Sequence, residues 1–126
     1  MSQETSSNLK TTPLTQIHKE LGGKLVPFAG WQMPIQFQGV IQEHQCVRDG
    51  VGIFDVSHMG EIEIRGPSSK NLIQKLMTND IDSMQDNQAL YTLMCLEHGG
   101  VVDDLLVHRF SEDHYFLCVN AANTEK

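Results

Sequence analysis

The sequence predicts an α+β fold in which helices pack on one side of a mainly antiparallel sheet. Apolar residues recur at helical spacing in three segments, and the last third of the chain contains three closely spaced runs typical of β-strands. Short loops separate those runs, at His98–Gly100 and Ser111–Asp113. Because loops of this length join antiparallel neighbours, the three runs are predicted to form a meander.

Three helices are predicted. The first is capped by Thr12, begins at Pro13 and ends at Gly22-Gly23, and the others cover about 40–49 and 67–78. Residues 25–37 contain too much proline and glycine for a regular central strand, so an extended segment with breaks is expected there.

Four strands are predicted. Ile62 and Ile64 alternate with polar residues in GEIEIRG, which is typical of a strand with one buried face. The meander strands are expected at 88–96, 101–110 and 114–120. One compact domain with a core fits a length of 126 residues.

Composition excludes several classes of function. The formal net charge of −7 is unlike that of a nucleic-acid-binding protein. No segment is long and apolar enough to span a bilayer, and the first ten residues lack the apolar run of a signal peptide. We therefore expect a cytoplasmic protein without a nucleic-acid or membrane partner, with a disordered polar tail over residues 1–9.

Cysteine and histidine spacing indicates no metal site. The three cysteines form no CxxC pair and are expected to be buried thiols, and the six histidines show no metal-ligand spacing. His18, on the apolar stripe of the first helix, is expected to be a packed or hydrogen-bonded structural residue.

The segment VVDDLLV (101–107) is the most informative for function. Apolar residues lie on both faces of this predicted strand, which is typical of a covered strand. A carboxylate in such a place is costly unless it is hydrogen-bonded, and burial raises its pKa. Asp103 and Asp104 are therefore candidate proton donors or acceptors.

Strand register favours Asp104. If Ser111–Asp113 is a symmetric three-residue loop, Phe110 faces His114 and Asp104 lies opposite Asn120. If the loop between the predicted strands 88–96 and 101–110 has two or four residues, Tyr91 lies on the same face as Asp104. One face would thus gather a phenol, a carboxylic acid and an amide.

Each of these residues also has a simpler interpretation. The two aspartates can be solvated strand-end residues, Tyr91 a core aromatic, and Asn120 the last residue of its strand. In DVSHMG (55–60), a tight polar turn is favoured over a catalytic triad, and Met59 is expected to enter the next strand as an apolar residue.

Several segments together resemble a known family. FAGW, FDVSHMG, LMTNDI, GGVVDDLLV and CVNAANTEK occur here in the order and spacing found near the start of the glycine cleavage T proteins. This family consists of folate-dependent aminomethyltransferases. The resemblance runs from about residue 9 to residue 126, and it implies that residues 10–126 are the N-terminal part of the multi-domain folate-binding aminomethyltransferase fold.

The resemblance also implies a reaction. Family members take the aminomethyl group carried by lipoylated H protein, release ammonia and transfer the one-carbon unit to tetrahydrofolate during glycine catabolism. It implies that Asp104 is the catalytic aspartate and that Met59, Tyr91 and Asn120 contact the folate. Asp103 receives no role and is expected to be structural.

Length is the one departure from the family, whose members are considerably longer. We therefore expect the isolated chain to have little transferase activity and to self-associate through exposed apolar surface. Two other functions are compatible with the sequence. One is a folate-dependent demethylase of the same superfamily, and the other is a non-catalytic folate-binding module.

Overall fold

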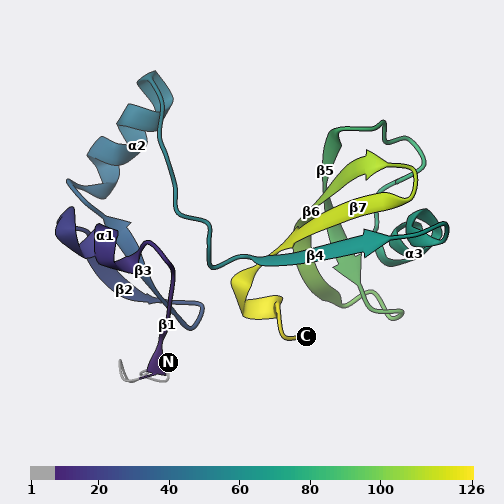
Figure 1. Cartoon of the computed structure of the whole chain (residues 1–126), viewed down its shortest axis with the longest axis horizontal. Coiled ribbons are helices and arrows are strands. Elements are labelled where there is room, and N and C mark those ends of the chain that lie inside the picture. Colours follow the sequence, from purple (N-terminus) through teal and green to yellow (C-terminus); the bar gives the residue numbers. More distant parts are fainter. Residues whose placement is uncertain (1–7) are drawn as a thin grey trace. The chain divides into compact units, whose positions relative to one another are not determined.

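The computed structural model describes residues 8–126, so most of the tail predicted for residues 1–9 lies outside the described residues. The chain divides into two compact units, Met1–His58 and Met59–Lys126, which are traced in Figure 1. Each is described by itself. The predicted assignment of residues 10–126 to one folate-binding region stays a prediction.

The N-terminal unit contains a three-stranded sheet with the strand order β1-β3-β2. Its strands are β1 (Lys10–Thr11), β2 (Lys24–Phe28) and β3 (Trp31–Gln36). The predicted extended segment with a break is confirmed at Ala29-Gly30, but the expectation that it forms no regular strand is wrong, because β2 and β3 form a hairpin. Ala29 and Gly30, both with positive φ, make its turn.

Pro34 is compatible with a central strand because β3 has two neighbours over only part of its length. The short strand β1 pairs with Trp31 and Gln32 alone. Beyond Gln32, β3 pairs only with β2, so a residue without an N–H is tolerated there.

Two helices complete the N-terminal unit. Helix α1 (Thr15–Glu20) begins two residues later than predicted, because Pro13 and Leu14 form a turn in which the Thr15 N–H donates to the Thr12 carbonyl. It ends before Gly22, whose φ is +77°, as expected. Helix α2 (Val40–Asp49) has the predicted bounds. The Glu43 carboxylate in its first turn accepts the N–H groups of Phe37, Gln38 and Gly39, which precede the helix.

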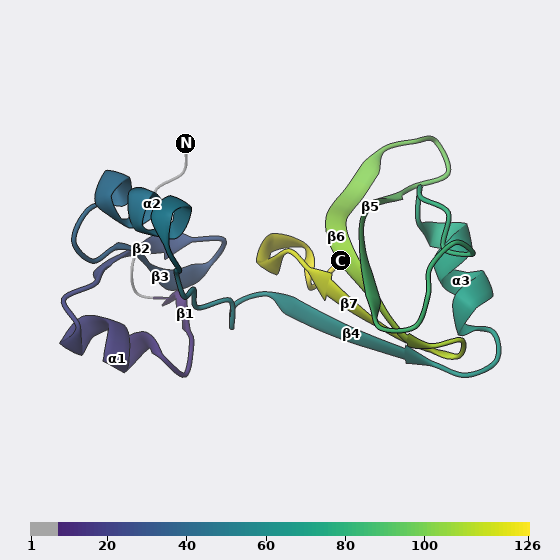
Figure 2. The same ribbon diagram turned by 90° about the horizontal axis from the view of Figure 1, so that it is seen from above.

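The C-terminal unit is an antiparallel four-stranded sheet with the order β4-β7-β6-β5. The strands are β4 (Gly60–Arg65), β5 (Gln88–Cys95), β6 (Val101–Ser111) and β7 (His114–Val119). Helix α3 (Ser69–Leu76) is two residues shorter at each end than predicted and lies along one side of this sheet (Figure 2). The predicted antiparallel α+β architecture is confirmed.

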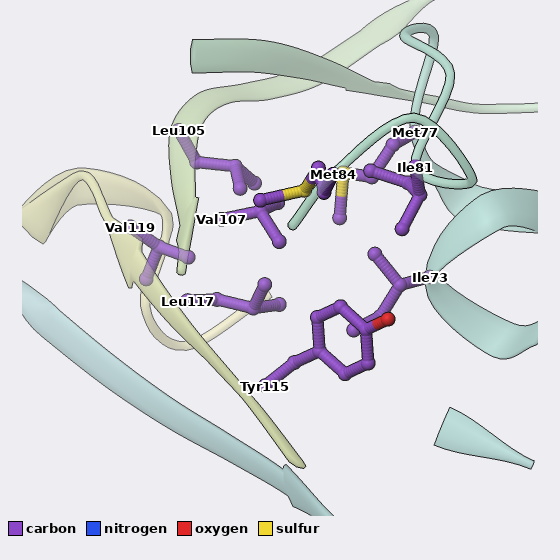
Figure 3. Packing of buried hydrophobic residues seen from close by; sticks show 9 residues of the cluster. All are labelled: Ile73, Met77, Ile81, Met84, Leu105, Val107, Tyr115, Leu117 and Val119. Carbon is purple, nitrogen blue, oxygen red and sulfur yellow. The ribbon is translucent and has the colours of Figure 1, made fainter. Parts of the chain in front are cut away.

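The hydrophobic core of this unit lies between α3, the loop after it and one face of the sheet. Ile73 of α3 points toward Tyr115 and Leu117 of β7, as Figure 3 shows. The buried members of the cluster are Ile73, Met77, Ile81, Met84, Leu105, Val107, Tyr115, Leu117 and Val119. Ile64 packs against it, whereas Ile62 remains 40% exposed.

Candidate functional site

The opposite face of the C-terminal sheet carries the predicted site residues. Val107 pairs with Leu117 and Leu106 with Cys118, so the predicted β6–β7 register is confirmed, although the loop is not. Ser111 pairs with His114 across a two-residue loop, and an irregularity between Arg109 and Ser111 restores the predicted pairing. On the other side of β6, Leu93 pairs with Asp104, which places Tyr91 on the Asp104 face.

Tyr91, Asp104 and Asn120 are joined by hydrogen bonds. The Tyr91 hydroxyl donates to Asp104 Oδ2. Asn120 Nδ2 donates to Asp104 Oδ1 over 3.0 Å and to the Asp104 carbonyl over 2.7 Å. The predicted convergence of a phenol, a carboxylate and an amide is therefore present, and each carboxylate oxygen of Asp104 accepts one side-chain hydrogen bond.

Asp104 is exposed within this chain, so the prediction of a strand covered on both faces is wrong. Leu105 and Val107 are fully buried on the Asp103 face, whereas Leu106 on the Asp104 face is 36% exposed. Tyr91 is likewise 60% exposed and is not a core residue. Apolar residues on both faces of a strand do not reveal which face the rest of the chain covers.

Asp103 is the buried member of the acid pair. Its Oδ2 accepts the Asn120 N–H over 2.9 Å, and its Oδ1 accepts Asn120 Nδ2 over 2.9 Å and Asn123 Nδ2 over 2.6 Å. Burial favours a higher pKa for Asp103, but the hydrogen bonds from Asn120 and Asn123 outweigh it and hold the pKa below its usual range. Asp103 is therefore a buried carboxylate that stays ionised.

The Tyr91 phenol is held in its neutral form. Its hydrogen bond to Asp104 raises the Tyr91 pKa, and desolvation and the nearby negative charges act in the same direction. At neutral pH, Tyr91 is therefore a hydrogen-bond donor rather than a phenolate. Asp104 in turn accepts hydrogen bonds from two side chains, those of Tyr91 and Asn120.

Met59 lies just before β4 and is half-buried, so it does not enter the strand as predicted. Gly60 pairs with Val119, which places Met59 beside Asn120 in the continued register. Its expected contact with folate stays a prediction.

Asn123 was not predicted as a site residue. It belongs to the short 3₁₀ helix Ala121–Asn123, and its side chain contacts Asp103. The three-residue spacing between Asn120 and Asn123 is the signal in the sequence, because one helical turn brings residues at that spacing to the same side.

A second polar cluster lies in the N-terminal unit. Asp55 Oδ2 accepts the Thr12 hydroxyl and His18 Nε2, each over 2.8 Å, and Asp55 Oδ1 accepts the Ser57 N–H over 2.9 Å. The expected polar turn in DVSHMG and the structural role of His18 are thus confirmed. The contact between Asp55 and α1 was not predicted.

Beside this cluster lies an open, mostly apolar groove of about 810 Å³. Its walls come from α1, β3, α2 and residues 52–55. It lies within the N-terminal unit and contains none of the predicted site residues.

No metal centre is evident in residues 8–126, where no three His, Cys, Asp or Glu side chains gather as ligands. All three cysteines are free; Cys95 and Cys118 are half-buried, but Cys46 is exposed, so the prediction of buried thiols is wrong for Cys46. Within the same residues, no helix is long and apolar enough to cross a membrane.

The antiparallel sheet with its acid, phenol and amide is the scaffold that the sequence led us to expect of an aminomethyltransferase N-terminal region. The family model described as the GCVT N-terminal domain matches residues 14–126. The chain therefore belongs to the GCVT N-terminal domain family.

Relatives and a solved structure agree with this membership. The chain is 55% identical over 120 residues to an aminomethyltransferase of Desulfitobacterium hafniense (strain Y51), covering 95% of this chain and 33% of the relative. It is 54% identical over 119 residues to one of Thermoanaerobacter sp. (strain X514), covering 94% and 32%.

The crystal structure of glycine cleavage system aminomethyltransferase T from Bartonella henselae matches with a TM-score of 0.83 and 33% identity. That match covers 93% of this chain and 33% of the Bartonella chain. The chain thus spans about a third of the length of these relatives.

Proposed function

We propose that this chain provides the N-terminal part of a tetrahydrofolate-dependent aminomethyltransferase of the glycine cleavage system. The reaction takes the aminomethyl group from lipoylated H protein, releases ammonia and gives 5,10-methylenetetrahydrofolate. The observation that carries the proposal is the hydrogen-bonded group of Tyr91, Asp104 and Asn120 on one open sheet face, in a chain of this family. A cytoplasmic location belongs to the same proposal.

In this proposal Asp104 is the catalytic residue. An exposed carboxyl group can accept a hydrogen bond from a ring N–H of tetrahydrofolate and move a proton as the new C–N bonds form. Tyr91 and Asn120 hold its two oxygens in place, so little reorganisation is needed when the substrate binds. Tyr91, Asn120 and Met59 are the proposed folate contacts.

The partner in this proposal is the lipoylated H protein, which delivers the substrate. Relatives of this chain are about three times as long, and their remaining regions can contribute further contacts to folate and H protein. We therefore expect the chain alone to have little transferase activity.

The experiment is a chimera in which residues 8–126 replace the matching segment of the Desulfitobacterium hafniense relative. Formation of methylenetetrahydrofolate and release of ammonia are measured with aminomethyl-loaded H protein. The proposal expects turnover comparable to that of the parent enzyme. Turnover of dimethylglycine, sarcosine or a sulfonium compound in place of H protein would instead identify a demethylase.

Asp104→Asn in the chimera separates catalysis from binding. Loss of the proton-transferring group is expected to lower kcat by about 10²–10⁴-fold, with tetrahydrofolate binding largely kept. Unchanged turnover would contradict the catalytic role. Folate binding without turnover in the unsubstituted chimera would point to a non-catalytic folate-binding module.

A further inference from the structure

Asp103 lies behind the exposed site and is joined to it through one side chain. It is 4% exposed, on the core face of β6, and the resemblance to known families assigns it no role. Because neighbouring residues of a strand point to opposite faces, Asp103 and Asp104 cannot both face a substrate on the open side. Asp103 can act on that side only through a residue that reaches both faces.

Asn120 is such a residue. Its backbone N–H donates to Asp103 Oδ2, and its side-chain Nδ2 reaches Asp103 Oδ1, the Asp104 carbonyl and Asp104 Oδ1. The distances from Nδ2 to these three oxygens are 2.9, 2.7 and 3.0 Å. An amide NH₂ group has only two hydrogens, so its orientation is set by where these acceptors lie.

We propose that Asp103 is a positioning residue of this site, whose buried carboxylate orients the Asn120 side chain so that it donates to Asp104. The inference rests on the proposed function of Asp104. A carboxylate suits this task because it only accepts hydrogen bonds, so it admits a single orientation of the Asn120 NH₂ group. Hydrogen bonds to an ionised buried acceptor are also stronger than neutral ones.

The alternative is that Asp103 only secures the turn after β7. Asn123 Nδ2 donates to the same Asp103 Oδ1 over 2.6 Å, and no hydrogen bond joins Asn123 to Asp104. Asn123→Ala therefore removes a donor from Asp103 without touching the bond between Asn120 and Asp104. It is the matched control for a merely structural role.

Asp103→Asn is the decisive substitution because it keeps the shape of the side chain. Its carboxamide has one accepting oxygen and one donating NH₂ group, but donors face both oxygens of Asp103. Either the backbone or the side-chain donor of Asn120 must then face another donor. The Asn120 carboxamide is expected to lose its fixed orientation.

The first measurement uses the uniformly ¹⁵N-labelled 126-residue chain. In Asp103→Asn, the Asn120 side-chain amide protons should exchange with water about tenfold faster relative to the backbone amides of β6, as expected for loss of one charge-assisted hydrogen bond. Asn123→Ala should change this ratio less than about twofold. Equal ratios in the two variants would overturn the proposal.

The second measurement uses the chimera. Asp103→Asn should lower kcat/KM for tetrahydrofolate about tenfold, and Asn123→Ala should lower it less than about twofold, at matched stability in urea. Equal losses in both variants, in proportion to lost stability, would reduce Asp103 to a structural residue. An inactive unsubstituted chimera would refute the proposed function instead, while the exchange measurement would still decide whether Asp103 orients Asn120.

Discussion

Asp55 provides a sharp test of what stabilises the N-terminal unit. Its side chain is 2% exposed and receives the Thr12 hydroxyl, His18 Nε2 and the Ser57 N–H. These bonds connect the start of α1 with the segment after α2, so one carboxylate joins two distant parts of the unit. Asp55→Ala leaves those donors without an acceptor.

The expected loss of stability is about 1.5–3 kcal/mol, the range for buried hydrogen bonds to a charged group. Trp31, the single tryptophan, lies in β3 of the same unit and reports its unfolding by fluorescence. With an m-value near 1 kcal/mol/M in urea, the midpoint should fall by more than about 1 M. Asp49→Ala is the control, because Asp49 is exposed and accepts only from Gln45.

Lowering the pH should abolish the stabilisation that the Asp55 carboxylate provides. Burial favours a higher pKa for Asp55, but hydrogen bonds from His18, Ser57 and Thr12 hold the pKa well below its usual range. Because the pKa of Asp55 is lower in the folded state than in the unfolded state (about 3.9), ionised Asp55 stabilises the fold at pH values above about 3.9. This stabilisation is lost as the pH falls toward the folded-state pKa. The gap between wild type and Asp55→Ala should be constant from pH 7 to about 4.5 and shrink below it. A midpoint shift no larger than that of Asp49→Ala would refute this account.

Three further outcomes are expected. Ile73→Ala should destabilise the C-terminal unit by about 2–5 kcal/mol, because Ile73 is fully buried. Leu72→Ala, at a 46% exposed site, should cost less than about 1 kcal/mol. Urea unfolding followed by circular dichroism measures both. In Asp104→Asn, Tyr91 should titrate at a lower pH by ultraviolet absorbance, because its hydrogen bond to Asp104 raises its pKa; an unchanged titration would contradict that cause. Exposed apolar residues such as Ile41 (83%) and Ile53 (99%) should drive concentration-dependent self-association in sedimentation velocity, and a monomer at all concentrations would contradict it.

The C-terminal sheet was predictable because its signals are local. Glycine and polar loops mark the meander, and the alternation of Ile62 and Ile64 with polar residues marks β4. The predicted register between β6 and β7 is correct although the predicted loop length is not, because the irregularity near Phe110 compensates for the shorter turn. Placing Asp104 opposite Asn120 requires the exact register, and the irregularity between Arg109 and Ser111 restores it.

The N-terminal sheet and the environment of the acid pair were not predictable in the same way. Pro34 is compatible with β3 only because β1 ends its pairing at Gln32, a tertiary fact without a local signal. Likewise, apolar neighbours on both faces of β6 do not show that one face is open in this chain. Asp55 contacts His18 of α1 across 37 residues and Thr12 across 43, and no local sequence pattern reveals either contact.

The acid pair shows how one strand can give two identical side chains different environments. Alternation places Asp103 on the core face, where three donors contact its two oxygens, and Asp104 on the open face, where Tyr91 and Asn120 donate to it. A buried ionised acid is costly unless it is fully hydrogen-bonded, so Asp103 needs Asn120 and Asn123 close by. The same requirement fixes Asn120 beside Asp104. The Asn120 side chain thus links the buried acid to the exposed one.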